Sequence, residues 1–444
     1  MEKEFSNVDS SAILGEFPTC GQDWANHIAG FYTADTQLKV VLEMDGRIQA
    51  DKMIKAVRQS IDVESILGCY LQETDRDPIW KRFEHIDDMK WCLVEECKDK
   101  DLALKKFFSS LLSPSSRQLQ AYIFQTNIND ILCLTFNHSC TDVSGIKGYL
   151  HILSNIYRQL CSNIDYYPEL KNNTNRSIDQ IFQNLGITDL KKAWNSKQDN
   201  SKANWAFPFT NEGRHKQLVS IRKILKDEFE EILSYIKSNN ATVNDFMMTA
   251  YYRTLYSLIK PKTLEPKEIT TTVDLRRYLH SHNTAAICSN MSVKINSVLD
   301  WIEGESFTTT LKRVSTMMKK LKQDNPGINS AIAMELIRDM GYKNVKSFFG
   351  NTSKLAVKSR KSSPLLTNMG VIADYPFCIG ETAVKDAYIV SPAGYAPNFI
   401  LGFSSYNNNL TMTVHYFEPE TSSKDVDSFF DLLINEIRVF QLSS

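Results

Sequence analysis

The chain has 444 residues, of which 42% are hydrophobic and 23% charged, an ordinary globular composition that is rich enough to bury a large core. With 51 basic and 52 acidic residues the formal net charge is -1, which gives no electrostatic footprint for nucleic acid or for an anionic membrane. Single hydrophobic cores stop growing beyond roughly 250–300 residues, so we expect two lobes, one over residues 1–200 and one over residues 201–444.

Targeting signals, disulfides and metal sites are not expected. The N-terminus is polar and has no apolar run behind it, so no secretory signal is expected. The sequence contains no stretch of about 18 apolar residues, so no transmembrane helix is expected. The nine cysteines include no Cys-x-x-Cys pair. They predict reduced thiols in a cytoplasmic protein without a structural metal.

The first half alternates strand and helix patterns. Two apolar runs, 119–125 and 131–136, are separated by turn residues and predict a hairpin, and the second run is so continuously apolar that it predicts a strand buried on both faces. A helical pattern of apolar residues follows from Val143 to Leu160. The other elements expected in this half are strands at 38–44 and 65–72 and a helix at 50–61.

The second half begins after a polar stretch, about 162–212, that we interpret as the crossing between lobes, with a short helix near 178–185. Thr242-Val243-Asn244-Asp245 resembles a capping box and predicts the start of a helix that Pro261 ends. Mixed strands and helices in both halves indicate an α/β architecture with two lobes. The other expected elements are strands at 217–225, 270–273, 291–295, 364–372, 386–390, 398–403 and 409–415, and helices at 227–237, 306–321 and 425–440.

The loop after the buried strand carries the clearest candidate for chemistry. Residues 137–142 read Asn-His-Ser-Cys-Thr-Asp, so His138 is followed four residues later by Asp142. An imidazole has an unperturbed pKa of about 6.5 and suits proton abstraction near neutral pH. The spacing alone leaves an alternative open, in which His138 is an ordinary loop histidine and Asp142 only caps the next helix.

Several segments in order resemble one family. The segment 137–142 after an apolar strand looks like the His-x-x-x-Asp motif of the superfamily of chloramphenicol acetyltransferase and nonribosomal peptide condensation domains. Residues 42–48 with the helix behind them resemble the opening of that family, and 242–245 resembles the start of its second half. Val273-Asp274-Leu275-Arg276 and Thr367-Asn368-Met369-Gly370 match two further segments, so the resemblance extends over essentially the whole chain.

The resemblance implies a fold and a site. Two similar lobes would pack as a V-shaped pseudo-dimer with a tunnel between them, and His138 would be the general base at its middle. Asp142 would pair with Arg276 and hold the loop, a task that suits a guanidinium. Asn368, Gly370, Asn137 and Gly145 would contribute to substrate binding, Asn368 by lining the tunnel and Gly370 by allowing close approach of the backbone.

The resemblance also implies a function. The chain would transfer an acyl group from a thioester, acyl-CoA or a phosphopantetheine-linked carrier protein, to a hydroxyl or amine, as a monomer with no tightly bound cofactor and no metal. It suggests secondary metabolism or acyl-lipid assembly. The alternative is a non-catalytic condensation-like module that binds carrier proteins and recruits partners.

The sequence departs from the family pattern at two positions. Asn137 stands where many condensation domains have a second histidine, and Val143 stands where the family often has glycine, with Gly145 two residues further on. A β-branched Val143 is expected to narrow the tunnel or to shift the start of the helix. The Asp-Phe-Gly-Trp-Gly signature of plant acyltransferases is absent near the C-terminus, which places the chain outside that branch.

Two further features have competing interpretations. Cys140 inside the motif is a possible nucleophile, but His138 is the only base near it in the sequence, so we favour the general-base role of His138. A basic run has two interpretations, and it consists of Lys354, Lys358, Arg360 and Lys361. It is either a docking site for phosphates or for a carrier protein, or a solvated surface loop. We favour the surface loop.

Overall fold

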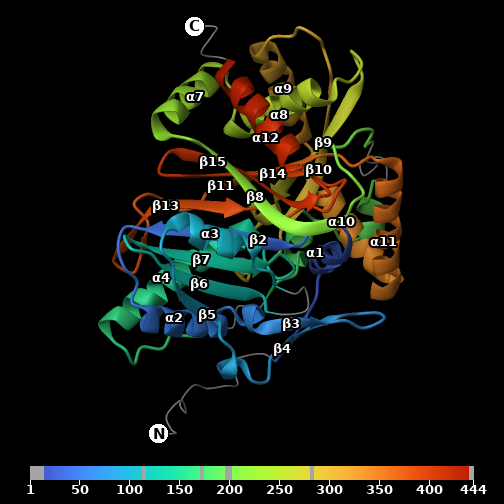
Figure 1. Cartoon of the computed structure of the whole chain (residues 1–444). Coiled ribbons are helices and arrows are strands. Elements are labelled where there is room, and N and C mark those ends of the chain that lie inside the picture. The colour runs from blue at the N-terminus through green and yellow to red at the C-terminus, as the bar shows by residue number, and fades with distance from the viewer. Residues whose placement is uncertain (1–14, 113–116, 171–174, 196–202, 281–284, 440–444) are drawn as a thin grey trace.

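The structure is a computed structural model that describes residues 15–112, 117–170, 175–195, 203–280 and 285–439. It contains two six-stranded sheets, one above the other in Figure 1, each with helices on its outer side. A separate hydrophobic core lies against each sheet. The predicted α/β class and the division into two lobes are confirmed.

The first sheet has β7 at its centre, and β7 leads into the candidate motif. All eight residues of β7 are buried, as predicted, because helices cover both faces of the sheet. Leu132, Leu134 and Phe136 pack in the core that α2 and α4 close, whereas Ile131 and Cys133 pack in a smaller cluster with residues of α3. In order, the strands are β12 (Cys378–Ile379), β13 (Thr382–Val390), β2 (Gln37–Met44), β7 (Asp130–Asn137), β6 (Leu119–Gln125) and β5 (Cys92–Glu96), and the helices are α2 (Ala50–Val63), α3 (Lys100–Ser109) and α4 (Val143–Ser162).

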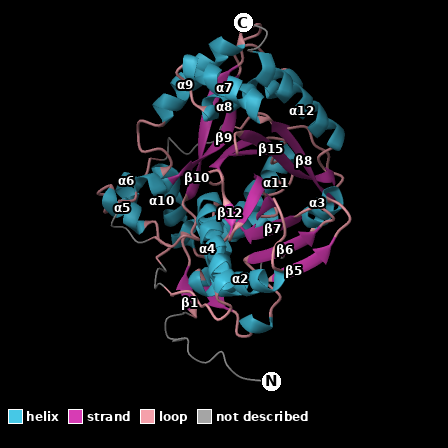
Figure 2. Cartoon of the chain, turned by 90° about the vertical axis from the view of Figure 1, so that its left-hand side faces the viewer, coloured by secondary structure: helices cyan, strands magenta, loops and turns pink. Residues whose placement is uncertain are grey.

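The second sheet is covered on one face by four helices, which lie together at the top of Figures 1 and 2. Its other face is turned towards the first lobe. The predicted capping box is present, because the Asp245 N–H donates to Thr242 Oγ1 at 3.1 Å and the Thr242 N–H donates to Asp245 Oδ2 at 3.0 Å. In order, the strands are β10 (Ser292–Asp300), β9 (Pro266–Asp274), β11 (Leu365–Val371), β14 (Ile400–Tyr406), β15 (Asn409–Pro419) and β8 (Arg214–Ile224), and the helices are α7 (Lys226–Ser238), α8 (Val243–Ile259), α9 (Phe307–Leu321) and α12 (Ser423–Arg438).

The second half of the sequence contributes two strands to the first sheet. Strands β12 and β13 come from the second half but complete the first sheet, where Val390 pairs with Lys39 of β2. A cut at residue 200 therefore does not separate the two sheets, and the predicted boundary itself lies outside the described residues.

The remaining elements lie around the lobes. A short sheet has the order β1 (Glu16–Pro18), β4 (Ile79–Arg82) and β3 (Cys69–Gln72). The predicted strand at 65–72 is wrong in its first half, because Ser65–Gly68 forms a 3-10 turn in which the Leu67 N–H donates to the Glu64 carbonyl. The other helices are α1 (Gly21–Tyr32), α5 (Asp179–Asn184), α6 (Leu190–Ala193), α10 (Ile328–Leu336) and α11 (Tyr342–Ser359).

Half of the basic run before Asn368 lies on a helix. Lys354 and Lys358 belong to α11, so the predicted loop is wrong for these two residues, and Arg360 follows the end of that helix with a φ of 56°. The run was mistaken for a loop because Lys and Ser suit an exposed helix and a solvated loop equally well.

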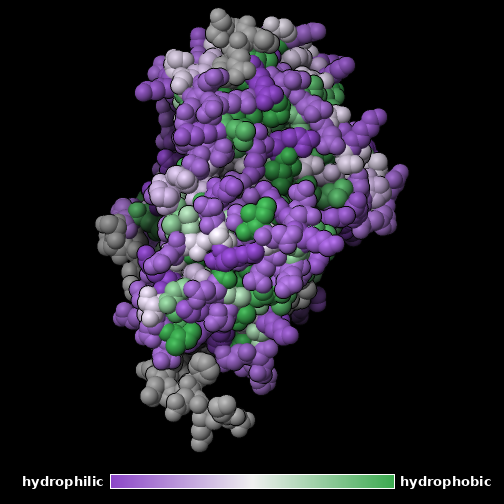
Figure 3. Space-filling view, turned by 60° about the vertical axis from the view of Figure 1, so that its left-hand side comes forward, coloured by the Kyte–Doolittle hydropathy of each residue, from purple (hydrophilic) through white to green (hydrophobic). Residues whose placement is uncertain are grey.

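On the face of the molecule drawn in Figure 3, hydrophilic side chains predominate and the hydrophobic ones form separate patches.

Candidate active site

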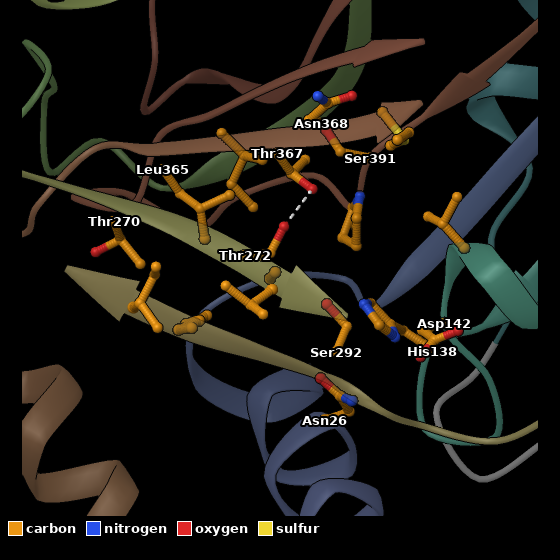
Figure 4. A pocket seen from close by; sticks show the side chains of 18 of the residues that line it. Asn26, His138, Asp142, Thr270, Thr272, Ser292, Leu365, Thr367, Asn368 and Ser391 are labelled. Carbon is orange, nitrogen blue, oxygen red and sulfur yellow. Dashed lines mark hydrogen bonds between the residues drawn. The ribbon is translucent and has the colours of Figure 1, made fainter. Parts of the chain in front are cut away.

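A cavity of about 890 Å³ lies between the two lobes and contains His138 and Asp142 in its wall. The first half contributes residues of α1, β2, the motif loop and α4, and the second half contributes residues of β9, β10 and β11 with the loops beside them. Figure 4 shows Thr270, Thr272 and Thr367 along the strands and the His138 ring where β9 ends and β10 begins. A cavity of this size suits a small-molecule substrate.

The backbone and ring of His138 are both held by hydrogen bonds. Its N–H donates to the Thr36 carbonyl at 2.7 Å, and its Nδ1 lies 2.9 Å from the Thr141 carbonyl. A carbonyl oxygen only accepts, so Nδ1 carries the proton in this contact. In the neutral ring the lone pair is then on Nε2, the tautomer that a general base needs.

Burial lowers the pKa of His138 below its ordinary value. The negative charge of Asp142 and hydrogen bonds to the Thr141 carbonyl and the Asn290 side chain oppose that effect without reversing it. The neutral imidazole is therefore the main form at neutral pH.

Asp142 begins α4 and joins the two halves of the chain. Its Oδ1 accepts the Gly145 N–H at 3.0 Å, and its Oδ2 accepts the Met291 N–H at 2.8 Å. The Arg276 Nη1 lies 2.9 Å and 2.8 Å from the two carboxylate oxygens, and the Arg276 Nη2 donates to the Ser289 carbonyl. Burial alone would raise the pKa of Asp142. The charge and hydrogen bonds of Arg276, together with the hydrogen bonds from the Gly145 and Met291 N–H groups, lower it overall.

Val143 does not shift the helix, because α4 begins at Val143 directly after the Asp142 cap. Val143 does line the cavity, at the position where the family often has glycine.

Asn137 and Gly145 are described, and neither is among the residues that line the cavity. Asn137 is buried, and its Oδ1 accepts the N–H and the hydroxyl of Ser139, which fixes the turn after β7. Gly145 packs against the 287–288 segment of the second half. Their substrate contacts remain a prediction, and in the structure both hold the motif loop.

Replacing Gly145 with alanine is expected to destabilise the protein by about 1–3 kcal/mol. A Cβ there would lie 2.7 Å from the Ile287 carbonyl oxygen, a backbone atom that cannot move aside easily. Chemical unfolding would measure the loss. Gly186→Ala is the control for the loss of a glycine in an open place, because nothing lies near its Cβ position, although its own φ of 68° adds some strain. A Gly145→Ala protein as stable as wild type would contradict the close contact.

Asn368 and Gly370 line the cavity from β11, where the strand bulges. Asn368 Oδ1 accepts the Gly370 N–H at 2.9 Å, and Gly370 has a φ of 66°, which favours glycine. The bulge changes the direction of the strand beside the cavity, and Figure 4 shows Asn368 next to Ser391 there.

Cys140 is fully buried and its thiol donates to the Asn137 carbonyl. Burial raises the pKa of this thiol far above its ordinary value. A thiolate is the reactive form of cysteine, so the structure gives no support to Cys140 as a nucleophile.

Sequence reasoning missed a second buried ion pair behind the motif loop. Arg176 Nη2 lies 2.8 Å from Asp23 Oδ1, and both side chains are almost completely buried. Arg176 Nη1 donates to the carbonyls of Cys140 and Cys288, and so connects the motif loop to the second half. Asp23 also accepts the Asn290 amide, whose Nδ2 donates to the Ser139 carbonyl at 2.7 Å. No local pattern signals this pair, because its residues are far apart in the sequence.

Thr36 is a further residue of the site that the sequence did not indicate. It supplies the carbonyl that holds the His138 N–H, lines the cavity and has a φ of 53°, which is rare for a β-branched residue. Backbone strain of this kind is concentrated at functional sites.

The described residues include no group of three or more His, Cys, Asp or Glu side chains placed to hold a metal ion. Within the same residues no helix combines the length and the apolar character that crossing a membrane requires.

No protein-family model and no curated protein sequence matches the chain, so its likeness to known proteins is one of structure. The solved structures that match it include condensation domains and an O-acetyltransferase, and they share its fold. The predicted superfamily resemblance is thereby confirmed at the level of the fold.

Three particular structures illustrate the match. Trichothecene 15-O-acetyltransferase from Fusarium sporotrichioides is 11% identical, with a TM-score of 0.70 over 96% of this chain and 95% of that chain. The first condensation domain of the CDA synthetase is 13% identical, with a TM-score of 0.68 over 96% of both chains. Polyketide synthase associated protein 5 from Mycobacterium tuberculosis is 12% identical, with a TM-score of 0.65 over 95% of this chain and 99% of that chain.

Proposed function

We propose that the chain is an acyltransferase that moves an acyl group from a thioester to a hydroxyl or amine, with His138 as the general base. One observation carries the proposal: His138 lies in the wall of the cavity between the lobes with Nδ1 bound to a carbonyl, which leaves the Nε2 lone pair for a substrate. The fold, shared with an acetyltransferase and with condensation domains, supports the reaction class.

The chemistry follows from the tautomer. Nε2 of His138 takes the proton from the acceptor O–H or N–H while the acceptor attacks the thioester carbonyl. The tetrahedral intermediate then collapses with cleavage of the C–S bond, and the thiolate leaves and takes up a proton from the imidazolium. The Thr141 carbonyl and Asp142 are placed to favour the imidazolium that exists between these steps.

The test is a thiol-release assay with acyl-CoA and acyl-carrier-protein donors and a panel of alcohols and amines. Release that depends on both donor and acceptor supports the proposal. A chain that binds an acyl-carrier protein but turns over no donor would instead fit the recruiting module, and the transferase assignment would be wrong.

The pH dependence of kcat/KM is expected to follow the neutral form of His138. Because burial lowers the pKa of this imidazole, the base becomes active at lower pH than an exposed histidine, so kcat/KM should rise with pH to a midpoint below about 6.5 and then level off. Initial rates between about pH 5 and pH 8 measure this. A midpoint clearly above neutrality would contradict the assignment.

A further inference from the structure

The cavity carries an excess of positive charge. Five basic and two acidic side chains are among the described residues that line it: Lys147, Arg277, Lys294, Lys322 and Lys361 against Asp142 and Asp274. Both carboxylates already have partners. Asp142 pairs with Arg276, and Asp274 accepts the Ser144 hydroxyl at 2.6 Å and an Arg276 nitrogen at 3.3 Å. Both acidic groups therefore already have partners, and none of the four lysines forms an ion pair with a carboxylate in the part of the chain that the structure describes.

Lys147 is the basic residue closest in sequence to the motif. It lies on α4 one turn after Val143, so it is on the face of the helix that lines the cavity. A Cβ added to Gly370 would lie 3.1 Å from Lys147 Nζ, which places the ammonium group against the bulge of β11. Gly370 thus leaves room for this side chain as well as adopting the left-handed φ.

The ammonium group of Lys147 is partly buried and has no carboxylate within salt-bridge distance among the described residues. Burial lowers its pKa, and the more distant charges of Asp274 and Asp142 only oppose this. A buried charge is costly unless it is paired, so such a cation beside a cavity favours an anionic ligand.

We propose that the cavity takes a substrate with an anionic group, a carboxylate or a phosphate, and that Lys147 binds this group on the α4 side of His138. That the ligand is a substrate rests on the proposed acyl transfer, whereas the presence of the anion site does not. The anionic group can belong to the thioester donor, as the phosphates of coenzyme A do, or to the acceptor, as a carboxylate.

The experiment compares Lys147→Met and Lys147→Arg with wild type by calorimetry. Two matched pairs of probes separate the sources: coenzyme A with pantetheine, which lacks the nucleotide phosphates, and mandelate with its methyl ester. Lys237→Met is the control, because Lys237 is an exposed lysine of α7 outside the cavity lining. A lost charge-assisted hydrogen bond predicts roughly 10–100-fold weaker binding of the charged member of one pair to Lys147→Met.

If Lys147→Met selectively loses affinity for coenzyme A, the anionic group belongs to the donor. If it selectively loses affinity for mandelate, the anionic group belongs to the acceptor. Lys147→Arg should retain most of the affinity and Lys237→Met all of it. The inference is overturned if wild type prefers the charged member of neither pair, or if Lys147→Met weakens both members of a pair equally. Because calorimetry needs no turnover, selective binding without thiol release would leave the anion site standing and overturn the proposed acyl transfer.

Discussion

Replacing His138 with alanine is expected to lower kcat about 10²–10⁴-fold, the usual contribution of a positioned general base. The physical reason is that alanine removes the Nε2 lone pair, and no other described histidine lies in the wall of the cavity. The side chain is only partly buried, and its Nδ1 contact is to the backbone carbonyl of Thr141, so the fold should survive the change. The thiol-release assay at saturating donor measures the loss, and circular dichroism checks the fold.

Two variants control for this result. His151→Ala removes an exposed histidine from the same helix that follows the motif, and it should leave turnover unchanged. Cys140→Ala removes the other candidate nucleophile of the motif and should change turnover only through packing, because that thiol is buried and protonated. Turnover of His138→Ala within a few-fold of wild type would show that the base is another group.

The strand and loop that carry the motif could be predicted because their signals are local. An apolar run of the length of β7 must be buried on both faces, and a polar residue after it must lie where the strand ends. The Asp142–Arg276 pair, by contrast, was predicted from resemblance, and the structure contains it: a single nitrogen of Arg276 donates to both carboxylate oxygens. The second nitrogen reaches Ser289 instead, so the guanidinium also holds the segment before β10.

The remainder of the site could not be predicted because it depends on contacts between residues far apart in the sequence. Nothing near Arg176 indicates that it is paired with Asp23, and nothing near β13 indicates that it joins a sheet of the first half. Asn137 was expected to contact substrate because of its position in the motif. In the structure its amide oxygen accepts two hydrogen bonds from Ser139, a contact that the sequence pattern does not reveal, and its contact with substrate stays a prediction.

The structure also explains why both halves must fold before the site exists. His138 is held by Thr36 of the first half, Asp142 by Arg276 and Met291 of the second, and the cavity is lined by both. A change that loosens the contact between the lobes is therefore expected to affect catalysis and stability together.

Replacing Arg276 with methionine is expected to lower the free energy of unfolding by about 3 kcal/mol near neutral pH, because it leaves the carboxylate of Asp142 buried without its counter-charge. Methionine keeps much of the length and apolar volume of the side chain, so loss of charge dominates. The same variant should lose most turnover, since Asp142 and the Ser289 segment are no longer tied together. Urea unfolding and the thiol-release assay measure the two effects.

The sign of the pH dependence separates lost charge from lost packing. In wild type Arg276 helps keep the pKa of Asp142 below its ordinary value, so this carboxylate stabilises the fold above the unfolded pKa and stops doing so as pH falls through the folded pKa. Without Arg276, burial raises that pKa, and protonation of Asp142 relieves the penalty as the pH falls. The difference in stability between the two proteins should therefore shrink from pH 7 towards about pH 4.

Arg222→Met is the control variant. It breaks an exposed ion pair with Asp427, so it should lower the free energy of unfolding by at most about 1 kcal/mol and show no such trend with pH. If the loss in free energy of unfolding caused by Arg276→Met stayed constant with pH, Arg276 would stabilise the fold through packing and not through its interaction with the charge on Asp142.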